Sequence, residues 1–114
     1  MLPQTARLRK TKDFKEVFGK GKGVRDGRLF LKARVVKNEG VRFGIVVSKQ
    51  VAAKAVDRNR MKRLLREAVK YCMPDMRGGH DIVLVTLPGF AAANLAEAKA
   101  QVISIIKKSS LAKP

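Results

Sequence analysis

Alternating hydrophobic and polar residues predict the strands of this chain. Residues 29–36 carry apolar side chains at their odd-numbered positions, and residues 41–48 alternate in the same way, which is typical of strands. Because a short turn signal separates the two segments, they are expected to pair as an antiparallel hairpin. The apolar run at 82–87 predicts a strand buried on both sides, and there is room for an additional short strand near Val24.

Apolar residues at helical spacing predict three helices. The first has Thr11 as its N-cap and ends at Gly19, the second covers residues 57–72, and the third is capped by Asn94. The long helical connection before the last strand is compatible with parallel pairing. This order of elements predicts one α+β domain over residues 1–114, with a small mixed sheet and helices largely on one side.

The charge of the chain is high and unevenly distributed. Its 114 residues include 26 Lys and Arg against 9 Asp and Glu, a net charge of +17. Residues 1–70 hold 21 of the basic and 6 of the acidic residues, and residues 1–10 are expected to form a basic arm. Self-repulsion of this size destabilises a compact fold unless a polyanion neutralises it, so nucleic acid is the expected class of partner.

The segment 57–72 combines a hydrophobic stripe with a cationic back. Within the helix after the expected cap, Glu67 is the only acid, so most cations lack the acidic neighbour that a solvated helix provides. Arginine offers a planar fork for phosphate, which favours a polyanion-binding face over a charge run that only maintains solubility. The candidate residues are Arg58, Asn59, Arg60, Lys62, Arg63 and Arg66.

Aromatic residues among cations form a second candidate surface. Phe14 and Phe18 share a face of the first helix, and Phe30 lies beside Lys32 and Arg34 on the outer face of a strand. Such a surface suits single-stranded nucleic acid, because each base that stacks on an aromatic ring contributes about 1–3 kcal/mol. The same helical spacing is typical of core packing, and the residues alone leave both interpretations open.

Signals for catalysis by the chain itself are weak. His80 is the only histidine and has no second histidine to complete a metal site, so neither a catalytic nor a metal site is predicted. Cys72 lies on an apolar helix face and, as the only cysteine, excludes an intramolecular disulfide. With no apolar run of membrane-spanning or signal-peptide length, a cytoplasmic location is expected.

Residues 58–67, with the sequence RNRMKRLLRE, resemble the signature helix of the bacterial ribonuclease P protein family. Residues 7–18 (RLRKTKDFKEVF) are similar to the opening of that family, and residues 42–49 (RFGIVVSK) to its central strand and following lysine. Residues 79–83 resemble its last strand. The resemblance covers almost the whole chain, and the signature helix together with the aromatic opening is a specific combination.

The resemblance implies a fold of the ribosomal-protein-S5-domain-2 type, in the order αβββαβα, with a left-handed βαβ crossover where the general rule gives a right-handed one. It also implies a role in the 5′ maturation of precursor tRNA by an endoribonuclease whose catalytic RNA carries the active site and its Mg²⁺ ions. The expected partners are that RNA and precursor tRNA, with no obligate protein partner and no membrane.

The family pattern also implies roles for the candidate residues. The cationic back of the helix at 57–72, together with Lys49, would contact the catalytic RNA. The single-stranded 5′ leader of the substrate would lie in a cleft between the sheet and the first helix. The leader-binding residues would be Phe14, Phe18, Phe30, Lys32 and Arg34. Many members of the family carry an aromatic residue where Lys32 stands.

Three other classes of protein fit part of the pattern. A small basic ribosomal protein would share the size, the charge and the type of fold. A helix-turn-helix DNA-binding protein would use the cationic helix, although a strand is predicted before it. A membrane-surface protein would need the same apolar stripe that the core of the domain requires.

Overall fold

The computed structural model describes residues 7–8, 10–37 and 40–112. Within them it contains the helices α1 (Thr11–Lys20), α2 (Ala55–Cys72) and α3 (Leu95–Lys108), and a short 3-10 helix, η2 (Met73–Asp75). The strands β1 (Lys22–Asp26), β2 (Leu29–Val35), β3 (Val41–Val46) and β4 (His80–Thr86) form one sheet in the order β1-β2-β4-β3. These elements confirm the α+β class, with β1 as the additional strand. Most of the expected basic arm lies outside the described residues.

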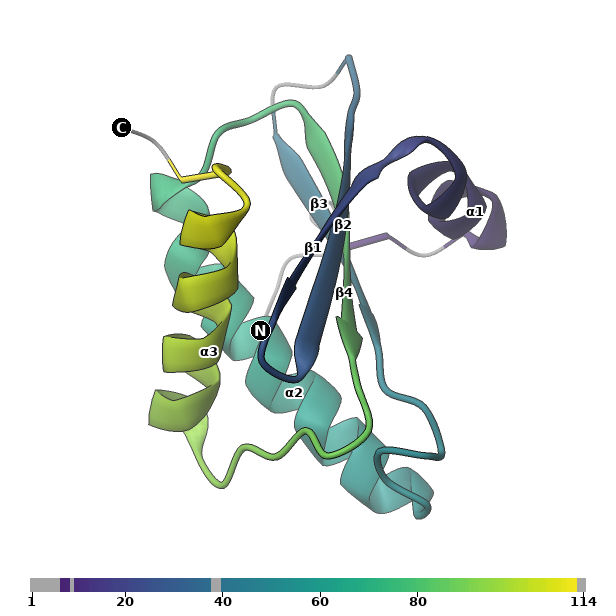
Figure 1. Cartoon of the computed structure of the whole chain (residues 1–114), viewed down its shortest axis with the longest axis vertical. Coiled ribbons are helices and arrows are strands. Elements are labelled where there is room, and N and C mark those ends of the chain that lie inside the picture. The colour runs from purple at the N-terminus through teal and green to yellow at the C-terminus, as the bar shows by residue number, and fades with distance from the viewer. Residues whose placement is uncertain (1–6, 9, 38–39, 113–114) are drawn as a thin grey trace.

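The expected hairpin between β2 and β3 is wrong, because β4 lies between them. β4 runs antiparallel to β2 and parallel to β3, so the predicted parallel pairing is confirmed. Ile82, Val83 and Leu84 of β4 are fully buried, and a strand that is apolar on both faces is stabilised most when it has a neighbour on each side. The connection from β3 through α2 to β4 is left-handed, as the resemblance implied (Figure 1).

Helix α1 is displaced by a residue or two from its predicted ends. Lys10, not Thr11, is the N-cap, and the helix continues through Gly19. It ends at Lys20, and the N–H of its C-cap, Gly21, donates to the carbonyl oxygen of Val17 at 2.8 Å. A Cβ atom at Gly21 would lie 2.9 Å from a carbonyl oxygen of β2, so glycine is required where the chain turns into β1.

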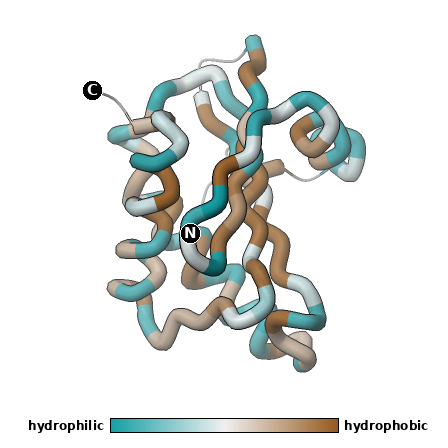
Figure 2. The backbone as a smooth tube through the Cα atoms, viewed as in Figure 1, coloured by the Kyte–Doolittle hydropathy of each residue, from teal (hydrophilic) through white to brown (hydrophobic). Residues whose placement is uncertain are grey.

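The main hydrophobic core lies between the sheet and the pair α2 and α3. The predicted stripe of α2 is confirmed, since Leu65, Ala68 and Val69 are fully buried. The helix begins two residues before the predicted boundary, at Ala55. Hydrophobic residues are concentrated in the strands beneath it (Figure 2). The cap of α3 is also as predicted, because Asn94 Oδ1 accepts a hydrogen bond from the following turn at 3.0 Å.

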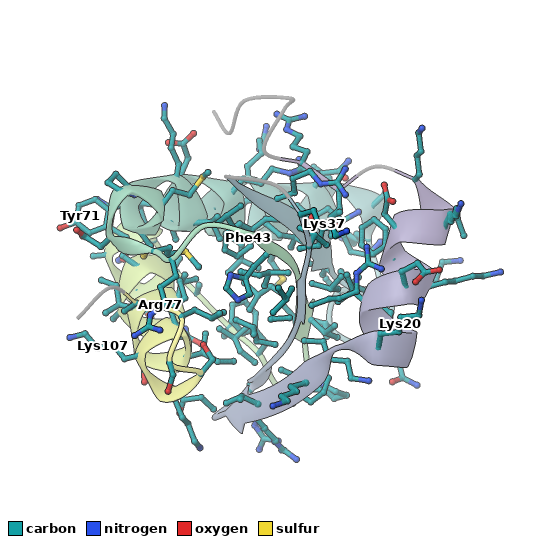
Figure 3. All side chains as sticks on the ribbon, turned by 90° about the horizontal axis from the view of Figure 1, so that it is seen from above. Lys20, Lys37, Phe43, Tyr71, Arg77 and Lys107 are labelled. Atoms are coloured by element: carbon teal, nitrogen blue, oxygen red, sulfur yellow. The ribbon has the colours of Figure 1, made fainter. Side chains whose placement is uncertain are left out.

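A smaller core joins α1 to the opposite face of the sheet. It consists of Leu8, Val17 and Val83, with Phe14 among the half-buried residues packed against it. The expectation that the helices lie largely on one side therefore holds for α2 and α3 but not for α1. Seen from above, the sheet separates α1, which carries Lys20, from the other two helices (Figure 3).

Candidate nucleic-acid interface

The strand register arranges the side chains on the α1 face of the sheet in three rows across β2, β4 and β3. The rows are Arg34–Asp81–Arg42, Lys32–Val83–Gly44 and Phe30–Val85–Val46. Helix α1 contacts the first two rows, through ion pairs to the first and apolar packing on the second. The third row contains only half-buried residues and forms a partly open apolar floor beside the helix.

The two phenylalanines of α1 differ in exposure. Phe14 is half-buried and lies against β3 at Gly44, where a Cβ atom would overlap its ring. Phe18, one turn further along, leaves 40% of its surface exposed. The spacing that left core packing and base stacking open therefore corresponds to one packed ring and one accessible ring.

The residues expected on the cleft floor also hold α1 in place. Lys32 Nζ donates to the backbone carbonyl of Phe18. Arg34 Nη1 donates to Glu16 Oε2 at 3.0 Å. Phe30 packs over β1, where a Cβ atom added to Gly23 would lie 2.6 Å from its ring. The floor is thus connected to both of its walls, the helix α1 and the edge strand β1.

The cationic back of α2 is solvent-accessible. Asn59, Arg60 and Arg63 are exposed, while Arg58, Lys62 and Arg66 are half-buried. Because α2 is preceded by β3 and a loop, the helix-turn-helix alternative is wrong. The burial of its apolar stripe removes the surface that membrane adsorption would use.

Two arginines in the first turns of α2 connect it to neighbouring loops. Arg58 Nη1 donates to the carbonyl oxygens of Ala52 and Ala53 at 3.0 and 2.8 Å, and Arg60 Nη2 donates to that of Ala93 at 3.0 Å. Lys49 is exposed in the turn before this loop. The Arg58 hydrogen bonds hold the loop that follows Lys49 against α2, and the Arg60 hydrogen bond holds the loop before α3.

A pocket of 290 Å³ joins the two candidate surfaces. It is lined by Phe14 of α1, Gly44 of β3, Arg66 of α2 and Arg7, which forms a parallel bridge with the residue before Gly44. Burial and the nearby charge of Arg7 lower the pKa of Arg66. An anion bound next to both cations would offset their mutual repulsion. Sequence reasoning placed Arg7 in the arm, because no local pattern shows that bridge.

The carboxylates on the α1 face already have cationic partners. Asp81 and Asp13 both contact Arg42, and the hydrogen bond and charge of Lys20, with Arg34 nearby, lower the pKa of Glu16. Among the described residues, no group of three or more His, Cys, Asp or Glu side chains is placed to hold a metal ion. No described helix is long and apolar enough to cross a membrane.

The mixed sheet with its left-handed crossover, the cationic helix and the adjoining pocket lined by Phe14 define a small basic α+β protein whose surface suits a polyanion. A family model described as Ribonuclease P matches residues 2–110. The chain belongs to the ribonuclease P protein family, whose members are the protein subunit of the enzyme that processes precursor tRNA. This assignment supports the ribonuclease P interpretation over the small ribosomal protein.

Relatives of this chain share both its sequence and its fold. The ribonuclease P protein component of Syntrophomonas wolfei is 37% identical over 113 residues, which cover 97% of this chain and 92% of the relative. That of Synechocystis sp. is 38% identical over 88 residues, or 76% of this chain and 71% of the relative. The solved RNase P protein of Thermotoga maritima is 26% identical with a TM-score of 0.79, covering 90% of this chain and 96% of that one. A Staphylococcus aureus structure, 24% identical with a TM-score of 0.85 over 95% of this chain and 98% of that one, shows the fold alone.

Proposed function

We propose that the back of α2 binds the RNA component of ribonuclease P. The observation that carries this proposal is the set of exposed and half-buried cations on α2, which has few acidic neighbours within the helix and continues through Arg66 into the pocket shared with Phe14. Arg63 is exposed on this face, whereas Arg58 and Arg60 also donate hydrogen bonds to neighbouring loops. The contacting set is Arg58, Asn59, Arg60, Lys62, Arg63 and Arg66, with Lys49 beside it.

The single-stranded 5′ leader of precursor tRNA binds in the cleft on the α1 face. Phe18 is the accessible stacking ring, and Phe14, packed against Gly44, lines the cleft at the pocket where Arg7 and Arg66 receive a phosphate. Phe30 belongs to the apolar floor, Lys32 lies in the row next to it, and Arg34 lies in the row beyond that. The two RNAs thus meet at the pocket between α1 and α2.

The RNA component, with the Mg²⁺ ions it holds, performs the phosphodiester cleavage. The protein contributes binding and orientation, since its carboxylates on this face are paired with arginine and lysine. The holoenzyme acts in the cytoplasm, where a single reduced cysteine is stable. The protein without RNA is therefore expected to show no cleavage of precursor tRNA.

The salt dependence of RNA binding tests the α2 surface. If about six to eight phosphates are contacted, the logarithm of the association constant falls with the logarithm of salt concentration at a slope of several units. Replacing both Arg63 and Arg66 with Ala is expected to reduce that slope by about two. The matched control replaces Arg77 and Lys107, which lie near the end of α3 away from α1 (Figure 3). An equal loss of slope in both double variants would reject α2 as the RNA-binding face.

Substrates with and without a leader test the cleft. Phe18→Ala removes an exposed ring, so it is expected to weaken holoenzyme binding of leader-bearing precursor tRNA by about 5- to 150-fold while leaving mature tRNA binding unchanged. Tyr71→Ala removes an exposed ring from the opposite side of the molecule and serves as the control. Equal effects of Phe18→Ala on both substrates would reject leader stacking.

A further inference from the structure

Asp81 is a fully buried carboxylate on the face of the sheet that α1 covers. It stands in register between Arg34 of β2 and Arg42 of β3. Arg42 makes a two-point contact with it, with Nε 2.8 Å from Oδ1 and Nη2 2.6 Å from Oδ2. Arg34 Nη2 lies 3.8 Å from Oδ2. Because an unpaired buried carboxylate is costly, Asp81 fixes both guanidinium groups at this end of the sheet.

Both arginines also contact α1. Arg34 Nη1 lies 3.0 Å from Glu16 Oε2, and Arg42 Nη1 lies 3.7 Å from Asp13 Oδ2. Asp13 and Glu16 are one turn apart, so the helix is held at two points along its axis. Two contacts to one rigid row fix the rotation of α1 as well as its distance from the sheet.

The side chains that line the cleft follow these contacts along α1. Phe14 comes directly after Asp13 and packs on Gly44, in the row next to Asp81. Val17 comes directly after Glu16 and is fully buried in the same small core as Val83. A rotation of α1 that broke the ion pairs would therefore move the Phe14 ring away from β3 and change the width of the cleft.

We infer that Asp81 is a positioning residue for the cleft, acting through Arg34 and Arg42 on the acids of α1. Asp81 itself touches no nucleic acid, since it is fully buried beneath α1. The inference rests on the proposed binding of the leader in this cleft. It assigns a role to three carboxylates, Asp13, Glu16 and Asp81. Without these acids, the same face of the protein would attract a polyanion more strongly.

Positioning and simple electrostatics predict opposite results when these acids are neutralised. Each lost carboxylate raises the net charge by one, which by charge alone strengthens the binding of any RNA. If the acids position α1, their loss instead weakens binding of the leader specifically. The sign of the change in leader preference therefore separates the two explanations.

The test uses ribonuclease P reconstituted from the protein and its RNA component. The measured quantity is the ratio of its affinities for precursor tRNA with a leader and for mature tRNA, at one salt concentration. The double variant Asp13→Asn, Glu16→Gln leaves the buried row intact and is expected to lower this ratio about five-fold. The control, Asp75→Asn with Glu97→Gln, makes the same charge change at two exposed positions away from α1 and is expected to leave the ratio unchanged.

Hydrogen exchange of the free protein supplies the structural readout. Amides of α1 are expected to lose protection in the double variant and in Asp81→Asn, while those of α2 and α3 keep it. If Asp81→Asn does not fold, the double variant decides alone. A ratio that stays the same or rises overturns the inference, even where α1 loosens. If the wild-type enzyme shows no leader preference, the proposed leader binding in the cleft is wrong. In that case, unchanged hydrogen-exchange protection of α1 in the variants also overturns the positioning role of Asp81.

Discussion

At the scale of single residues, Gly44 decides where the Phe14 ring lies. The ring occupies the space that a side chain at position 44 would fill, and the same pocket contains Arg66. A glycine inside a strand usually weakens it, so its presence here is explained by the close approach of an aromatic ring from another element. The position of the Phe14 ring in the cleft thus depends on the absence of a Cβ atom at Gly44.

Gly44→Ala is expected to destabilise the protein by about 1–3 kcal/mol, because the added methyl group forces Phe14 off the strand. Gly19→Ala is the control, since nothing lies within 4 Å of its Cβ position and alanine favours the helix by about 0.5–1 kcal/mol. Urea unfolding measures both changes. Combining Gly44→Ala with Phe14→Leu should restore part of the loss, and no recovery would contradict the assigned clash.

At the scale of elements, α1 is held to the sheet by charge as well as by packing. Glu16 accepts from Arg34 on the sheet and pairs with Lys20 on its own helix at 3.0 Å. These partners lower the pKa of Glu16 below its ordinary 4.5, with the Lys20 hydrogen bond as the largest cause. A carboxylate with a lowered folded-state pKa stabilises the fold above its unfolded value and loses that contribution as the pH falls through the folded value.

Acidification is therefore expected to loosen α1 at pH values below 4.5, before α2 and α3 unfold. Backbone amide chemical shifts of the nitrogen-15-labelled protein, followed from about pH 6 to about pH 3, measure this order of events. In the Glu16→Gln variant, the amide chemical shifts of α1 at neutral pH should already resemble those of the wild-type protein at low pH. They should then show no further transition below pH 4.5. A transition of α1 that survives unchanged in Glu16→Gln would assign it to another group.

The faces of the elements could be predicted from the sequence, but their pairing could not. Alternation placed Phe30, Lys32 and Arg34 correctly on one side of β2, because side-chain direction is a local property of a strand. The charged row was missed because Asp81 meets Arg42 across 39 positions of sequence. A turn signal shows that the chain reverses, yet it cannot show that a later, more hydrophobic strand will insert between the two segments. The roles of the residues in RNA binding stay predictions.

At the scale of the whole molecule, the net charge of +17 has opposite consequences for the free protein and for its complex. In the free protein the cations on the back of α2 repel one another, since Glu67 is the only acid within the helix beyond its first turn. In a complex with RNA the same cations face phosphates. Added salt weakens both interactions, so it stabilises the free protein and dissociates the complex.

Raising NaCl from about 0.05 to about 0.5 M is expected to increase the Tm of the free protein by about 5 °C, equivalent to about 1 kcal/mol, while RNA affinity falls by orders of magnitude. Arg63→Gln removes one exposed charge from α2 and should act in the same two directions at low salt, with a higher Tm and weaker RNA binding. Lys107→Gln, on α3, is the control and should change RNA binding little. Calorimetry and filter binding measure the two quantities. A lower Tm of the Arg63→Gln variant at low salt would mean that Arg63 stabilises the fold. The cations on the back of α2 would then not reduce the stability of the free protein, which contradicts the prediction.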